Sequence, residues 1–353
     1  MEDKPSTWKR VRCEAEALWK GDISSLEGLS IRNARLAFRD EPTGLFIISP
    51  DTNFSLETTR DGLNTTVESA IEISGVPTRV TARVALRDDG MPRRGTVEVE
   101  GLSVPALSKN NPELAYLQPY EIVSNVQADF ELDESGALTA TKFHLDGSGA
   151  IANAAVKTPL RMDKFDVAGS YDGVQDRVVL ESIALQGKPI AGKATASFAL
   201  TKKDGAFATA AGEITAENVK LTFPGFLRQD LTLSKVALKA DYDKASRRLS
   251  IERATVDAAA IAAEASGAVT FADGASPALA LSGTMQPITV SDLLEHWPLG
   301  VGEGAEAWIR SQVQGAMIGP VRVEANFPVG TLDKDVLPEN APGGDRELLP
   351  LAT

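Results

Sequence analysis

The sequence of 353 residues is poor in several residue types on which common functions depend. It has one cysteine, Cys13, which excludes an intramolecular disulfide, and two histidines, His144 and His296, which have no further histidine or cysteine at ligand spacing. Structural zinc sites use four such ligands, so none is expected here. Acidic residues outnumber basic ones by 49 to 36, and the net charge is −13. This balance argues against a nucleic-acid interface, which needs a basic stripe, and against a polybasic contact with an anionic membrane.

Long apolar runs are also missing. None reaches the roughly 18–20 residues that a membrane helix needs, and residues 1–10 contain no apolar signal-peptide core. Taken alone, these absences describe a soluble and untargeted chain. The alternative is a piece of a longer protein whose anchor and targeting segment lie outside it. The ending at Thr353, which looks cut rather than finished, favours this alternative.

One group of acidic residues resembles part of a metal-binding motif. Asp129, Glu131 and Asp133 match the start of a calcium-binding loop, but Glu134 stands where the sharp-turn glycine belongs and Ala140 where the bidentate acid belongs. The acids alternate with apolar residues, so we interpret them as the solvated face of a strand. No other spacing of acids, serines, lysines or glycines completes a catalytic or phosphate-binding motif. We therefore expect no metal, no cofactor and no enzyme activity.

The chain is rich instead in strand-like patterning that repeats. Hydrophobic residues make up 43% of it and aromatic residues only 6%, a profile suited to thin β-layers filled by small aliphatic side chains. One sequence pattern occurs twice at a fixed spacing, which aligns Val178 with Leu249. A weaker copy lies upstream and aligns Leu138 with Val178. Fixed-period self-similarity indicates a stacked architecture. In the stronger pair, which we call the long repeat, Val178, Leu180, Ile183, Leu185, Ile190, Phe198 and Leu200 align with Leu249, Ile251, Ala254, Val256, Ile261, Val269 and Phe271.

The local pattern predicts strands over most of the chain. From residue 29 onward apolar and polar residues alternate with a period of two. Ile31 lies on the opposite parity from Leu36 and Phe38, which predicts a β-bulge near Asn33. The connections are short and carry Asp-Gly turns, which favours antiparallel meanders. We therefore predict a mainly β protein, a long twisted antiparallel sheet of repeated strands with a few short helices.

The predicted helices lie at the ends of this pattern and at one break within it. A short helix is expected over residues 110–117, one from Ser291, its cap, to Trp297, and one over residues 305–314. We divide the chain into an N-terminal amphipathic helix in 1–25, a first β-sheet segment in 26–108, a repeated β segment in 109–290, a helical segment with a return strand in 291–330, and a loop or truncated tail in 331–353.

The order of several short motifs resembles one protein family. LLEHWP at residues 293–298 is followed by AEAWI at residues 305–309, by Gly315 and by a strand from Val321. RLAFRD at residues 35–40 and PELAYLQP at residues 112–119 precede them. In this order, over residues 26–330, the chain resembles the AsmA-like family of large bacterial envelope proteins, in particular its YhdP-type branch and more distantly TamB. Glu306 departs from the family, which often has arginine there.

The resemblance implies a sheet curled into an open groove with an apolar inner wall. It implies a periplasmic protein, bound to the inner membrane, that transports phospholipids between the inner and outer membranes. The implied partners are phospholipid acyl chains, with the membrane anchor and the outer-membrane contacts outside this chain. Trp297, Pro298, Trp308 and Ile309 are expected to anchor the helical segment against the sheet. The groove is expected to be lined by Val178, Leu180, Leu185, Phe198, Leu200, Leu221, Phe223, Leu249, Ile251, Val269 and Phe271.

Two other functions fit the same strand pattern. A structural or protein-interaction repeat module would close its apolar strand faces into a dry core and would bind no lipid. A carbohydrate-active β-protein would need two carboxylates that converge beside an aromatic platform. Four tryptophans and four tyrosines make such a platform scarce.

Overall fold

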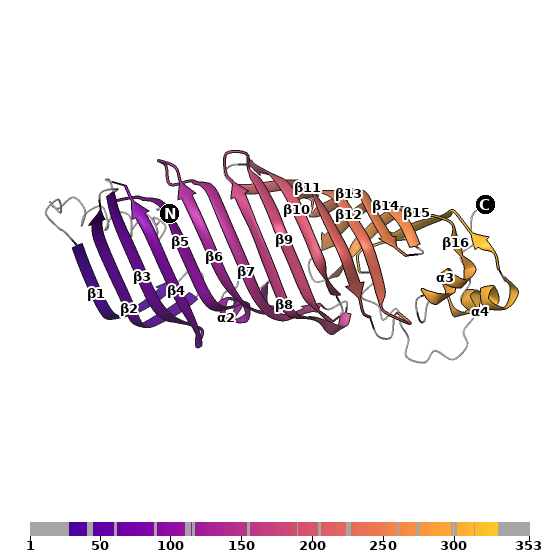
Figure 1. Cartoon of the computed structure of the whole chain (residues 1–353), viewed down its shortest axis with the longest axis horizontal. Coiled ribbons are helices and arrows are strands. Elements are labelled where there is room, and N and C mark those ends of the chain that lie inside the picture. Colours follow the sequence, from indigo (N-terminus) through magenta and orange to yellow (C-terminus); the bar gives the residue numbers. More distant parts are fainter. Residues whose placement is uncertain are drawn as a thin grey trace.

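The described chain folds as one long sheet, with two of its three short helices near one end (Figure 1). The computed structural model describes residues 28–40, 45–59, 62–87, 90–109, 114, 117–153, 156–188, 190–203, 206–223, 227–259, 261–272, 275–297, 299, 302–313 and 315–330. The expected N-terminal helix, most of the expected helix over 110–117, and the tail 331–353 lie outside these residues.

Sixteen strands make up the sheet, and nearly every strand pairs with the strand before it in the chain. The first eight are β1 (Gly28–Asp40), β2 (Leu45–Thr59), β3 (Gly62–Ile73), β4 (Val76–Leu86), β5 (Pro92–Ser103), β6 (Tyr120–Leu132), β7 (Leu138–Asn153) and β8 (Val156–Asp172). The others are β9 (Arg177–Lys188), β10 (Ile190–Lys203), β11 (Ala206–Leu221), β12 (Leu231–Asp243), β13 (Arg248–Ala258), β14 (Ile261–Ala272), β15 (Ala275–Met285) and β18 (Val321–Phe327).

All pairings in the sheet are antiparallel, as short connections predict. The strands lie side by side in chain order from β1 at one end of the molecule (Figure 1). The sheet is twisted and curled but does not close into a barrel, so the mainly β prediction is confirmed. β5 and β6 are hydrogen-bonded to each other, and the sheet therefore continues across the expected segment boundary at residue 108.

β-Bulges recur along the sheet. The predicted bulge in β1 is confirmed: the register shifts between Ile31 and Ala34, and Asn33 adopts a φ of 52°. Further register shifts interrupt β2–β3, β5–β6, β8–β9, β10–β11 and β13–β14. A bulge bends its strand and increases the local twist. Their recurrence in strand after strand gives the sheet its curl.

One period of the long repeat corresponds to four strands, from β9 to the start of β13. Asp176 and Arg247, one period apart, both adopt a left-handed conformation, with φ of 48° and 51°. Each accepts a backbone hydrogen bond from the second strand that follows: Leu200 N donates to the Asp176 carbonyl at 2.7 Å, and Phe271 N to the Arg247 carbonyl at 2.9 Å. The repeated sequence thus folds into repeated backbone geometry.

Three short helices occur in the described chain. α2 (Val104–Ser108) lies in the connection between β5 and β6 and is capped by Ser103, whose hydroxyl accepts from Ala106 N. α3 (Val290–Glu295) begins slightly earlier than predicted: Thr289, not Ser291, is the cap and accepts from Asp292 N. α4 (Glu303–Gln312) follows. β16 (Ile288–Thr289) pairs with β17 (Met317–Ile318) in a separate two-stranded sheet. This pairing joins the residues just before α3 to residues that follow α4.

None of the helices within the described residues has the length and apolar character needed to cross a membrane. The fold itself buries little. No large side chain in the described chain is fully buried, and half of the buried apolar residues are alanines. The fold therefore leaves much of its apolar surface in contact with solvent.

Candidate functional site: the apolar face of the sheet

Ten of the eleven predicted groove residues lie on one face of the sheet, which we call the apolar face. Residues opposite each other in register share a face, and Leu180 lies opposite Ala196, Phe198 opposite Gly212, and Leu249 opposite Val269. The same register places the rest: Val178, Leu185, Leu200, Leu221, Ile251 and Phe271. Phe223, the eleventh, lies beyond the end of β11 in the connection to β12, so the strand register does not place it on either face.

Bulges keep the apolar residues on one face. In β9 the polar pair Glu181 and Ser182 occupies the bulge, so Leu180 and Ile183 face the same way although their parity differs. Glu252 and Arg253 occupy the same place in β13, at the equivalent positions of the long repeat. The sequence alone left the inward parity near bulges open, and the register resolves it.

Phenylalanine rings cover glycines on the apolar face. In four register pairs of the described strands, a Cβ added to the glycine would lie 2.5–3.0 Å from an atom of the ring. A bulky residue that leans over a glycine of the next strand fills the space left by the missing side chain. At these positions the rings lie over the neighbouring strand, so the face has few protruding side chains there. The pairs are Gly95 with Phe130, Phe143 with Gly169, Gly147 with Phe165, and Phe198 with Gly212.

Within the described residues the apolar face belongs to a single sixteen-stranded sheet, and the second sheet holds only β16 and β17. Large side chains remain exposed even on the apolar face: Leu36 is 53% exposed and Phe271 is 46% exposed. Phe165 and Leu233 are buried on this face. The sixteen described strands therefore do not form the two packed sheets of a sandwich.

One end of the apolar face contains a small cluster of buried hydroxyl groups. Ser49, Thr52 and Ser69 are all buried, and their hydroxyls bond to one another, with 2.7 Å between Ser49 Oγ and Ser69 Oγ and 3.0 Å between Thr52 Oγ1 and Ser69 Oγ. Because each hydroxyl has a partner, their burial in an apolar surface costs little free energy.

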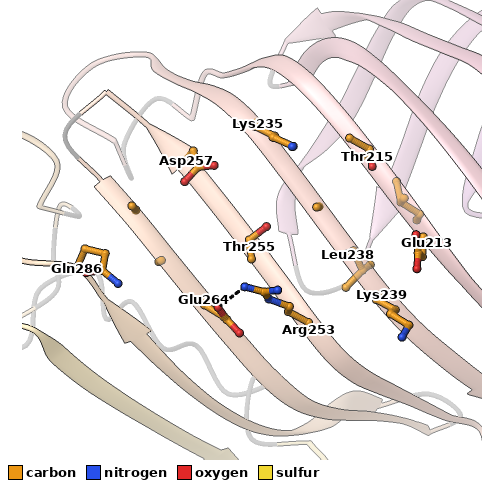
Figure 2. Close-up of a pocket in the computed structure, with 14 residues that line it drawn as sticks. Glu213, Thr215, Lys235, Leu238, Lys239, Arg253, Thr255, Asp257, Glu264 and Gln286 are labelled. Carbon is orange, nitrogen blue, oxygen red and sulfur yellow. Dashed lines mark hydrogen bonds and ion pairs between the residues drawn. The ribbon is translucent and has the colours of Figure 1, made fainter.

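The opposite face is charged. On β11–β14 it forms a shallow depression in which Arg253 pairs with Glu264 at 2.9 Å (Figure 2). Lys239 pairs with Glu252 at 2.8 Å, and its hydrogen bond to Glu252 raises the pKa of the lysine. Both partners of each pair are half exposed or more, so the pairs solvate this face rather than form a binding site.

Two of the three acids expected on a polar strand face lie there, whereas Asp133 follows the end of β6. His144 is on the charged face and contacts Asp166 at 3.1 Å, while its neighbours Phe143 and Leu145 belong to the apolar face. Asp129 and Glu131 also lie on the charged face. No group of three or more potential metal ligands occurs in the part of the chain that the structure describes.

A polar cluster lies where the apolar face ends at the β8–β9 turn. Tyr171 OH donates to Asp176 Oδ1 at 2.7 Å, and Lys202 Nζ lies 2.5 Å from the same oxygen and 2.8 Å from Tyr171 OH. The ammonium is also 5.5 Å from the centre of the Tyr171 ring. The hydrogen bond from Lys202 lowers the pKa of Asp176, and the same bond raises the pKa of Lys202. We call these three residues the rim cluster. Sequence reasoning missed it because Lys202 and Tyr171 are far apart in the chain.

The next repeat has aromatic contacts at the same place. Tyr242, the equivalent of Tyr171 in the long repeat, stacks on Phe207 with ring centres 6.4 Å apart and meets Phe271 edge-on at the same separation. Such pairs stabilise by about 0.5–1.5 kcal/mol beyond their area. The apolar face thus ends in a charged cluster in one repeat and in an aromatic cluster in the next.

Charged and polar contacts link the helical segment to the residues just before β12. Glu306 on α4 accepts two hydrogen bonds of 2.7 Å from the Arg228 guanidinium, which lies just before β12, and another of 2.7 Å from Arg310. The bond from Arg310 and the nearby Arg228 hold the pKa of Glu306 below its ordinary value. Gln229 donates to Glu295 of α3 at 2.7 Å. Glu306, the residue that departs from the family pattern, is the centre of this attachment.

The expected apolar anchoring is wrong for Trp308, whose side chain is 61% exposed. α4 buries none of its residues, so no apolar pocket receives this ring. Trp297 and Ile309 are half-buried, and Pro298 lies outside the described residues.

No protein-family model, no curated protein and no solved structure matches the chain. The resemblance to AsmA-like proteins therefore remains a prediction that rests on the order of its sequence motifs.

Proposed function

We propose that this chain is a section of a lipid-conducting groove, in which acyl chains lie on the apolar face and water wets the charged face. The observation that supports the proposal is one continuous apolar face across sixteen strands that no second sheet covers within the described residues. Soluble proteins rarely leave an apolar surface of this extent exposed unless it binds something.

The dimensions and chemistry of the face suit a mobile apolar cargo. With strands about 4.8 Å apart, sixteen strands span about 70 Å. Each methylene removed from water contributes about 0.8 kcal/mol, so an acyl chain is held without any specific polar contact. Where phenylalanine rings lie over glycines, few side chains obstruct the movement of the acyl chain. A surface that binds equally well along its length lets the cargo slide.

The setting follows from the resemblance rather than from the fold. In the proposal the groove lies in the periplasm, an anchor outside this chain holds it at the inner membrane, and phospholipids pass along it to the outer membrane. The chain performs no catalysis and needs no cofactor in this role. A protein-interaction role on the same face is the alternative, and it predicts a protein occupant instead of lipid.

Native mass spectrometry of the purified chain, with lipid extraction from the same sample, tests the proposal. We expect several phospholipids per chain, which detergent displaces. A chain that carries no lipid and takes none up from phospholipid micelles would contradict it.

A further inference from the structure

The rim cluster has the chemistry of a headgroup site. Tyr171 lies opposite Val178 in register, and Val178 lies opposite Phe198, so the cluster borders directly on the apolar face. Lys202 follows Leu200 on the same side of β10, which its contact with Tyr171 confirms. A lipid whose acyl chains lie on Val178, Phe198 and Leu200 would therefore bring its polar end to these three residues.

We propose that Tyr171, Asp176 and Lys202 bind the headgroup of a zwitterionic phospholipid, an inference that rests on the proposed function. The ammonium of Lys202 and the carboxylate of Asp176 lie side by side, and the two side chains are 42% and 32% exposed. A headgroup that contains both a phosphate and an ammonium matches this pair of charges. Its phosphate accepts hydrogen bonds from Lys202 Nζ and Tyr171 OH, and its ammonium donates to Asp176.

The pair of charges also determines which headgroups bind poorly. An anionic headgroup without an ammonium meets Lys202 but also the negative charge of Asp176 beside it. A neutral lipid without phosphate leaves the pair as it is and gains nothing from it. The cluster therefore favours the zwitterionic class over both others when the acyl chains are identical.

A neighbouring hydroxyl adds to the polar character of this end of the face. Thr141 lies opposite Tyr171 in register, and its buried Oγ1 has no hydrogen-bond partner. Buried hydroxyls are nearly always bonded, so this oxygen has unused capacity beside the cluster.

The repeat supplies a matched control. Tyr242 occupies the position equivalent to Tyr171, but its ring contacts Phe207 and Phe271 instead of a charged pair. Tyr171→Phe removes a hydroxyl that touches both Asp176 and Lys202. Tyr242→Phe makes the same chemical change and keeps both ring contacts.

The test measures binding of three lipids with identical acyl chains to the purified full chain: phosphatidylethanolamine, phosphatidylglycerol and diacylglycerol. We expect phosphatidylethanolamine to bind about three- to fivefold more tightly than the other two, since partly exposed charge pairs contribute modestly. Tyr171→Phe and Lys202→Gln should reduce this preference, whereas Tyr242→Phe should keep it. Asp176→Asn should raise binding of phosphatidylglycerol relative to phosphatidylethanolamine, a change that a merely structural ion pair would not produce.

The possible outcomes separate this inference from the proposed function. Equal binding of all three lipids, unchanged in the variants, overturns the headgroup site and leaves the groove. Equal effects of Asp176→Asn on both phospholipids also overturn it, because they show a structural role only. Binding of none of the three lipids overturns both the inference and the proposed function.

Discussion

Phe143 of β7 lies directly opposite Gly169 of β8, and its ring occupies the space where a side chain at Gly169 would stand. A Cβ at Gly169 would lie 2.8 Å from Phe143 Cζ and 2.5 Å from the Val179 carbonyl oxygen. Because the ring fills the space beside the glycine, the apolar face has neither a gap nor a protruding side chain at this position. This relationship recurs in three other register pairs and connects the sequence to the proposed conducting surface.

Gly169→Ala should therefore destabilise the protein. The added methyl group displaces either the ring or the backbone of β9, and overpacking of this kind costs about 1–3 kcal/mol. Urea denaturation measures the difference. Gly304→Ala is the control, because nothing lies within 4 Å of an added Cβ there and alanine favours α4. Equal stability of the two variants would show that the ring does not rest on the glycine.

Asn218 should tolerate glycine but not valine. Its φ of 51° places it in the left-handed region, and as the bulge residue of β11 it keeps Ala216 and Val219 on the apolar face. Asn218→Val should lower the free energy of unfolding by about 1–2 kcal/mol, and Asn218→Gly by less than about 1 kcal/mol. Chemical denaturation compares the two. A valine variant as stable as the glycine variant would contradict the bulge geometry.

Leu180→Asp should abolish most lipid binding while the protein stays folded. Leu180 lies on the apolar face and is only half-buried, so a carboxylate there mainly opposes an acyl chain, and burying it under one costs several kcal/mol. We expect at least about a tenfold loss of bound phospholipid and a stability change of about 1 kcal/mol. Ile251→Asp, in the next repeat, should behave alike. Val179→Asp is the control, because Val179 lies opposite Ser170 and Ser197 on the charged face. If Leu180→Asp and Ile251→Asp both unfold the protein, these residues form a packed core instead.

Attachment of the helical segment should weaken in acid. Arg310 and Arg228 lower the pKa of Glu306 from its ordinary value of 4.5 in the folded protein. A depressed carboxylate pKa stabilises above the unfolded value and loses that contribution as the pH falls through the folded value. Protection of the α4 amides, measured as the ratio of the intrinsic to the observed hydrogen-exchange rate at each pH, should therefore fall below about pH 4.5, and Glu306→Gln should show low protection already at neutral pH. Protection factors in α4 that are the same at pH 7 and pH 3 in the unmodified protein would refute the role of Glu306.

Local patterning predicted much of the fold. The bulge at Asn33, the antiparallel order and the shared face of Leu180 and Ile251 all follow from alternation and from the long repeat. These features are local or periodic, and side-chain direction in strands has a fixed period. The cap at Thr289 was missed because Thr289 and Ser291 are both good caps.

What sequence could not predict depends on contacts between distant residues. The pairing of Phe143 with Gly169 requires the register of β7 on β8, which no local signal fixes. The rim cluster joins Tyr171 to Lys202 across two intervening turns of chain. The attachment of Arg228 to Glu306 joins residues 78 positions apart. Trp308 was expected to be buried because large aromatic residues usually are, but α4 meets no apolar surface that could receive it.

The most direct test of the central claim compares the two faces of one strand. A photo-crosslinking amino acid at Leu180 or Ile251 points from the apolar face, and one at the adjacent Val179 or Ser250 points from the charged face. We expect crosslinks to phospholipid in living cells from Leu180 and Ile251, and none from Val179 and Ser250. Crosslinks to phospholipid from neither face, or equally from both, would contradict it.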